Sequence, residues 1–326
     1  MKFYLAIFSL VVCFLLALAI GTVNIPMPEL IGILWQTEQD TPTAQIFWQF
    51  RLPQALTAVI AGSALSLSGL QMQTLFQNPL ADPFVLGITA GASLGVSVVV
   101  LMGGEVLGNV GIVTGAAMGA LLALILLLIF TPILRSSTNL LVLGLLLGYI
   151  NNGIVTILLQ FTSSDRLRNY VSWTLGSFSQ VTWEHLPALF TSVLSGAVLS
   201  FYLTSALNTL LLGENQARSL GTELTKVHLV VLVSTALLTG SVTAFCGPIA
   251  FLGVAVPHLC RSFWQTSDHR QLFWAVILVG ASLALIADIG TKVIGNGIIL
   301  PLNSLTAILG IPIMINILIK SYTVHY

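Results

Sequence analysis

The sequence contains one regular series of polar residues inside an otherwise apolar segment, residues 139–161. Asn152, Thr156 and Gln160 follow Gly148 at intervals of four residues. In a helix they would lie along one slowly turning face. Uncharged hydrogen-bonding groups are tolerated within a membrane where they face a partner or a wet cavity. The series therefore indicates either the lining of a passage or a set of hydrogen bonds between helices.

A second polar segment, within residues 210–226, is too short and too polar to cross a membrane. Gly213 and Gly221 bracket it, with Glu214 near its start and Arg218 near its end. This order of charges suits the dipole of a short helix, and the spacing allows an i,i+4 ion pair. We predict a short helix lying across one mouth of a membrane bundle. The alternative is a solvated connector.

Two isolated cations flank apolar segments. Arg51 precedes segment 54–75, and Lys292 follows segment 272–290. Both would present positive charge on one face of the membrane. The alternative is that each anchors its helix by extending its charge to the interface.

The apolar segments lack the groups that several other activities need. No Asp, Glu, Lys or Arg lies near the middle of any of them, whereas an ion-coupled carrier usually has one there. The sequence also has no paired histidines of the metalloprotease kind, no catalytic triad pattern and no P-loop. An ion-coupled carrier and a membrane-embedded enzyme are therefore both disfavoured. If the chain belongs to a pump, the energy source is on another chain.

The composition sets the fold class. Of 326 residues, 56% are hydrophobic and 7% are charged, against roughly 25% charged in soluble domains. Backbone groups in hydrocarbon need internal partners, and the long unbroken apolar runs favour helices over barrel strands. The formal net charge is zero, so no basic field is available for nucleic acid. We predict an all-α polytopic membrane protein with one domain, residues 1–326, whose three cysteines are small buried side chains.

Apolar runs of about 17 to 25 residues predict about ten transmembrane helices in one bundle. Seven of the eleven basic residues fall on the side of the N-terminus, which places both termini in the cytoplasm. The first segment, which follows Lys2, could also be a cleaved signal peptide, but a retained helix is the simpler interpretation. Glycines at intervals of four indicate close helix packing. The predicted spans are 4–23, 54–75, 85–103, 110–133, 139–161, 187–209, 227–246, 248–264, 272–290 and 304–320.

Several motifs, in order along nearly the whole chain, resemble one family. They are Arg51-Leu52-Pro53, Asn78-Pro79-Leu80-Ala81-Asp82-Pro83, Gly213-Glu214-Asn215-Gln216-Ala217-Arg218-Ser219-Leu220-Gly221, Gly247-Pro248-Ile249-Ala250-Phe251, Val256-Pro257-His258, Asp268-His269-Arg270 and Ala287-Asp288. The sequence resembles permeases of the FecCD type, the membrane subunits of ATP-driven importers for iron–siderophores, haem and vitamin B12. It departs from the family pattern at Gln54, where a second basic residue is common, and at Ile299, where a glutamate is usual.

The resemblance implies a bacterial cytoplasmic-membrane permease with ten helices per subunit. It further implies a second permease subunit in a homodimer, two ATPase subunits that bind ATP and Mg, and a periplasmic or lipoprotein substrate-binding protein. The chain itself would bind no cofactor or metal. An iron complex, a siderophore or haem, is the leading expectation for the cargo, and vitamin B12 is the alternative. The resemblance assigns Gly213, Glu214, Ala217, Arg218, Leu220 and Gly221 to ATPase coupling, Arg51 and Lys292 to binding-protein docking, and Gly148, Asn152, Thr156 and Gln160 to the translocation pathway.

Overall fold

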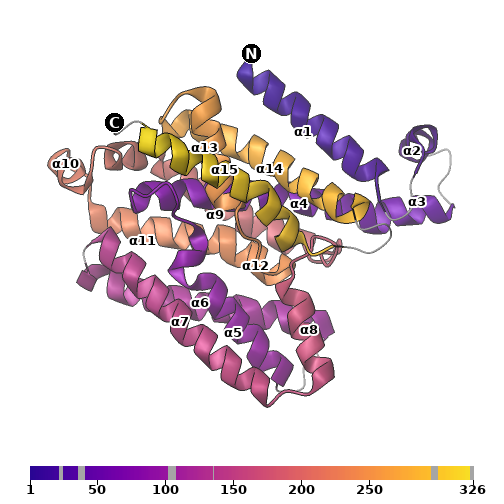
Figure 1. Ribbon diagram of the computed structural model, residues 1–326, viewed down its shortest axis with the longest axis horizontal. Helices are drawn as coiled ribbons and strands as arrows, with labels where there is room; N and C mark the ends of the chain where they lie inside the picture. Colours follow the sequence, from indigo (N-terminus) through magenta and orange to yellow (C-terminus); the bar gives the residue numbers. More distant parts are fainter. Residues whose placement is uncertain (22–24, 36–40, 102–107, 135, 295–299, 324–326) are drawn as a thin grey trace.

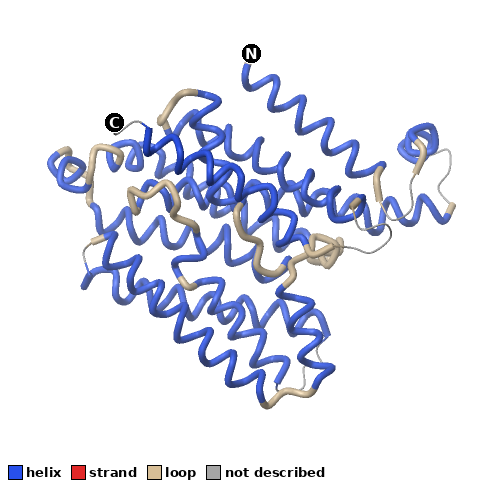
Figure 2. Tube along the Cα trace, viewed as in Figure 1, coloured by secondary structure: helices blue, strands red, loops and turns tan. Residues whose placement is uncertain are grey.

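The computed structural model describes residues 1–21, 25–35, 41–101, 108–134, 136–294 and 300–323. In this part of the chain all regular elements are helices, joined by short loops (Figure 2). The predicted all-α fold is confirmed. Residue 299 and the predicted span ends at 22–23 and 102–103 lie outside the described residues.

Each of the ten predicted spans corresponds to a helix or to one continuous helical segment (Figure 1). Seven of the described segments are long and apolar enough to cross a membrane. The ten are α1 (Lys2–Ala19), α4 (Leu52–Leu75), α5 (Ile88–Leu101), α6 (Gly108–Leu134), α7 (Ser137–Gln160), α9 (Leu186–Leu210), α11 (Leu224–Thr235) continued through a π-helical turn (Ala236–Gly240) into α12 (Ser241–Cys246), α13 (Leu252–Trp264), α14 (His269–Val293) and α15 (Leu302–Thr323).

Two of these helices are shorter than predicted. α5 has 14 residues and α13 has 13, so each is roughly 20 Å long, less than the thickness of the hydrocarbon core. The chain before α5 forms a 3₁₀ turn (Pro83–Leu86) that ends at Gly87 with φ 73°. Residues 247–250 before α13 are not helical. Hydrophobicity alone does not reveal where these two helices begin, because the buried loop residues before them are as apolar as the helical residues.

Short helices occupy the connections. They are α2 (Met27–Leu34), α3 (Pro42–Ile46) leading into a π-helical turn (Phe47–Arg51), α8 (Ser164–Thr174) and α10 (Glu214–Ser219). α8 carries Trp173, whose side chain is 2% exposed inside the bundle.

The bundle has two ends, which we name by their residues. At the α10 end, the Gln77 amide after α4 donates to Leu210 O at the end of α9 (3.1 Å), and Phe3 of α1 packs on Trp264 at the end of α13 (5.2 Å between ring centroids). At the Asp288 end, the start of α4 meets the end of α14. α15 runs from the Asp288 end towards α10 (Figure 1). The start of α1 and the end of α15 therefore both lie at the α10 end, which agrees with the prediction of one common side for the two termini.

Glycines let the helices approach backbone to backbone. An added Cβ at Gly91 of α5 would lie 2.5 Å from Gly119 O of α6, and one at Gly95 would overlap Gly115 O. At Gly69, in the C-terminal half of α4, a Cβ would overlap the carbonyl of Gly253 in α13. The predicted close packing is confirmed, and these contacts carry the van der Waals attraction that holds helices together in lipid.

We expect Gly69→Ala to destabilise the bundle by about 1–3 kcal/mol, because the new methyl group meets backbone that cannot move aside cheaply. Gly153→Ala is the matched control, since a Cβ there meets nothing within 4 Å. Thermal unfolding in detergent, followed by the loss of monodisperse protein, measures both. Equal unfolding temperatures for the two variants would contradict the role of this contact.

Candidate functional site

The polar face of α7 lies on the surface of the chain. Asn152, Thr156 and Gln160 are all exposed. The Thr156 hydroxyl donates to Asn152 O of its own helix (2.9 Å). Within the described residues, the amides of Asn152 and Gln160 have no hydrogen bond to another helix. The sequence left two interpretations of this series, the lining of a passage or hydrogen bonds between helices. Hydrogen bonds from these amides to another helix of the same chain are not observed among the described residues.

Part of this face opens into a cavity of about 300 Å³ between α7 and the start of α5. Gly148 leaves room for it, since no atom lies within 4 Å of a Cβ added there. Thr89 was missed by sequence reasoning: it is 5% exposed, lines the cavity, and its hydroxyl has no partner among the described residues. Only the pairing of α5 with α7 brings it to the polar face. The lining is uncharged and comprises Phe84, Val85, Thr89, Ala90, Ser93, Gly144, Leu145, Gly148, Tyr149 and Asn152.

The short helix predicted within residues 210–226 is confirmed as α10. Gly213 and Gly221 have φ of 98° and 86°, values that glycine adopts without the strain of a side chain. Ala217 is 0% exposed and fixes one side of α10 against the bundle, whereas Leu220 is 63% exposed. Arg218 is also exposed. One face of α10 is therefore anchored, and the other is available to a partner.

The predicted ion pair between Glu214 and Arg218 is wrong. Glu214 Oε1 instead accepts a hydrogen bond from Ser137 N at the start of α7 (3.2 Å). The same oxygen lies 3.6 Å from His228 Nε2 of α11. Helical spacing made the ion pair possible, but unpaired groups of two other helices are nearer.

A polar cluster lies beside α10, where α4, α9 and α14 meet. His269, 1% exposed, contacts Thr74 Oγ1 through Nε2 and Asn208 Oδ1 through Nδ1, both at 2.8 Å. The Asn208 amide donates to Asp268 Oδ1 (2.7 Å). This hydrogen bond holds the pKa of Asp268 below its usual value. The cluster ties the end of α9, and hence α10, to the centre of the bundle.

Arg51 does not present its charge on a face of the membrane, which was one of the two alternatives from the sequence. It is 5% exposed, and its Nη1 donates to Leu18 O and Ala19 O, each at 2.7 Å. The last carbonyl groups of a helix have no partner within that helix, so the guanidinium of Arg51 caps α1. A Cβ at Gly21 would lie 2.7 Å from its Nη2, which shows how closely the chain wraps this side chain.

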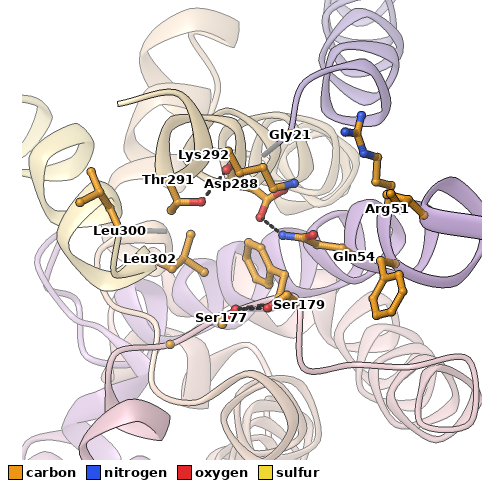
Figure 3. Close-up of a pocket in the computed structure, with 14 residues that line it drawn as sticks. Gly21, Arg51, Gln54, Ser177, Ser179, Asp288, Thr291, Lys292, Leu300 and Leu302 are labelled. Carbon is orange, nitrogen blue, oxygen red and sulfur yellow. Dashed lines mark hydrogen bonds and ion pairs between the residues drawn. The ribbon is translucent and has the colours of Figure 1, made fainter. Parts of the chain in front are cut away.

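The side chain of Lys292, in the last turn of α14, is also largely shielded from solvent. Its Nζ lies 2.7 Å from Asp288 Oδ2, and the two side chains are 8% and 3% exposed. Gln54 of α4 donates to the other oxygen, Oδ1, at 2.7 Å. Figure 3 shows this group beside a cavity of about 100 Å³, with Ser177 and Ser179 on its opposite wall. Arg51 and Lys292 thus line the same cavity, but each is bound within the chain, Arg51 to the carbonyls of α1 and Lys292 to Asp288.

Among the described residues, no group of three or more His, Cys, Asp or Glu side chains could hold a metal ion. Cys13, Cys246 and Cys260 are all buried as free thiols. The sites that the geometry does provide are therefore an uncharged polar face, an exposed helix at one mouth and a paired set of charges at the other. A membrane-spanning bundle with these sites fits the membrane subunit of a transporter.

Comparison with known proteins identifies the kind of transporter. The model of the FecCD transport family matches residues 9–320. The vitamin B12 import system permease protein BtuC of Klebsiella pneumoniae is 37% identical over 313 residues, covering 96% of this chain and 91% of the relative. The uncharacterized ABC transporter permease protein YvrB of Bacillus subtilis is 32% identical over 325 residues, covering 96% and 92%.

A solved structure has the same fold. It is an inward-facing conformation of a transporter assigned to the metal-chelate ABC type, with a TM-score of 0.87 and 27% sequence identity, and it covers 98% of this chain and 99% of its own. The chain belongs to the FecCD transport family. It is a multi-pass ABC importer permease of the FecCD and BtuC type.

We expect Lys292→Met to lower the free energy of unfolding by about 3–5 kcal/mol, because it leaves Asp288 buried with a charge and no counter-ion. The double variant Asp288→Asn with Lys292→Met should recover most of this loss. Lys226→Met is the matched control: its pair with Glu223 is 73% and 66% exposed, so the expected change is within roughly 1 kcal/mol. Unfolding in detergent measures all three, and a small effect of Lys292→Met would refute the buried pair.

Proposed function

We propose that this chain is the permease subunit of an ATP-driven importer that carries a metal-containing nutrient across the bacterial cytoplasmic membrane. The proposed cargo is an iron complex, a siderophore or haem. The observation that carries the proposal is the exposed, uncharged polar face of α7. A large cargo that must be released again needs a wide passage with few strong contacts, and this face has hydroxyl and amide groups and no charge.

The same face supports a homodimer. Amides such as Asn152 and Gln160 are costly to expose to hydrocarbon. A second copy of the chain, facing the first across a water-filled passage, would remove both side chains from lipid. The passage would then lie between the two copies. The cavity next to Gly148 and Thr89 would open into it from each copy.

The exposed side of α10 supports an ATPase partner. Leu211 and Leu212, just before α10, are 44% and 55% exposed, and Leu220, just after it, is 63% exposed. Exposed apolar side chains together with an arginine are typical of a protein contact. We assign ATP and Mg to this partner, one ATPase for each copy. The positive φ angles of Gly213 and Gly221 orient α10, and the buried Ala217 packs it against the bundle.

The Asp288 end is the proposed docking place for a substrate-binding protein, either periplasmic or lipid-anchored. An acidic side chain of that protein would have to compete with Asp288 for Lys292 and with two backbone carbonyls for Arg51. Docking would thus loosen contacts between α1, α4 and α14. This is a route by which arrival of the binding protein changes the bundle.

Vitamin B12 is a second candidate cargo, favoured by a specific observation. The relative at 37% identity over 96% of the chain is by name a vitamin B12 import permease. Cobalamin and ferric siderophores share a bulky, hydrogen-bonding periphery around a metal, so an uncharged polar passage suits either.

The test is reconstitution of the permease with the ATPase and binding protein of its own transport system in proteoliposomes. Cyanocobalamin, haemin and a ferric hydroxamate are supplied separately, and ATP-dependent accumulation is measured. We expect one of the three to accumulate only with ATP. Accumulation driven by an ion gradient without the ATPase would instead support an ion-coupled carrier. Failure of all three in an assembled, ATP-hydrolysing complex would refute the proposed cargo class.

We expect Arg218→Glu to weaken ATPase binding at least about tenfold, because reversal of an interface charge costs several kcal/mol. Arg168→Glu is the matched control, since Arg168 is exposed on α8 at the opposite end. Co-purification and the affinity between permease and ATPase measure the effect. Unchanged affinity for a folded Arg218→Glu variant would remove this residue from the coupling surface.

A further inference from the structure

The first turn of α7 is capped by a side chain from another part of the chain. Ser136, at the N-cap position, makes no side-chain hydrogen bond to the helix, although the first four N–H groups of a helix lack partners within it. Glu214 Oε1 accepts the hydrogen bond of Ser137 N at 3.2 Å. A carboxylate at this position also interacts favourably with the dipole of α7, which is 24 residues long.

Glu214 belongs to a helix that is anchored to the bundle. It is the first residue of α10, which Ala217 anchors at 0% exposure. His228 of α11, itself 1% exposed, lies 3.6 Å from the same carboxylate oxygen. The Glu214 side chain is only 26% exposed, so it points into the bundle while Arg218 and Leu220 point away from it. The carboxylate does not belong to the exposed face of α10.

α7 has one packed face and one exposed face. Its packing partners are α5, α6 and the turn before α5, and a Cβ added at Gly144 would lie 2.5 Å from Val85 O of that turn. The opposite face carries the proposed passage, and only 17% of the apolar window of α7 is buried. The hydrogen bond at Ser137 adds a link from this helix to α10.

We infer that Glu214 is the positioning residue that transmits movement of α10 to the passage helix α7, by holding the backbone amide of Ser137. The inference rests on the proposed function and deepens it, since it gives Glu214 a role different from that of the exposed residues around it. When the ATPase displaces α10, the hydrogen bond carries α7 along, and the polar face around Asn152 changes its exposure.

The experiment reads the movement of α7 directly. Gly153→Cys places a reporter on the exposed side of α7, where an added Cβ meets nothing within 4 Å. The three native thiols are buried. The full chain, bound to its ATPase in proteoliposomes, is treated with a membrane-impermeant methanethiosulfonate reagent, with and without ATP and vanadate. The ratio of the two modification rates reports the nucleotide response of α7.

Three variants separate the role of Glu214 from general damage. Glu214→Ala removes the acceptor, and Glu214→Gln keeps a neutral one. Ser137→Pro removes the donor instead: proline fits the first turn of a helix, and Ser136 already has the extended backbone, φ −138° and ψ 136°, that a following proline requires. Glu223→Ala is the matched control, because Glu223 is 66% exposed and pairs only with Lys226 in a surface contact.

We expect Glu214→Ala to reduce the nucleotide response about tenfold, as loss of a hydrogen bond to a charged group allows, while the ATPase stays bound. Glu214→Gln should keep part of the response, and Glu223→Ala all of it. Ser137→Pro should match Glu214→Ala, and the double variant should be no worse than either single one, because both remove one contact.

A normal response in Glu214→Ala, or additive losses in the double variant, would overturn the inference while leaving the proposed function intact. A parent chain that binds its ATPase but shows no nucleotide response would overturn both the pathway role of α7 and this inference. A parent chain that binds no ATPase would overturn the proposed function itself.

Discussion

An unpaired polar group in hydrocarbon costs several kcal/mol, and most features of this bundle follow from that cost. It forces the backbone into helices, and it leaves the helix ends as the places where partners must be found. The carbonyls at the end of α1 find Arg51. The amide at the start of α7 finds Glu214. The charged residues of this chain are therefore used largely at helix ends, which are also the places where a transporter meets its partners.

α4 connects the two ends. It is buried along most of its length, and glycines bring its backbone against α14 at Gly280 and against α13 at Gly253. Its first turn carries Gln54, bound to Asp288, and its last turn carries Thr74, bound to His269. A rigid helix with a polar contact at each end is suited to carry a displacement from one mouth of the bundle to the other.

α7 is the opposite kind of helix. Its polar side chains are exposed, its other side packs on α5, α6 and the turn before α5, and its first turn is capped by Glu214. The buried central helix and the exposed polar one therefore have different surroundings. In the proposed dimer the exposed faces of the two α7 helices would face each other, which is the arrangement a passage between copies requires.

The sequence by itself determined the helical class, the approximate position of ten spans and the short helix after α9, because each depends on residues close together in the chain. Hydrophobic runs report burial in lipid directly, and Gly213 and Gly221 mark the ends of α10 by their local conformation. The motifs also indicated the family. Only the tertiary structure decided where the charges go. Arg51 meets Leu18, Asp288 meets Gln54, and Glu214 meets Ser137 rather than Arg218. These partners are 33, 234 and 77 residues apart, and no local pattern specifies which of several possible partners lies nearest once the helices have packed.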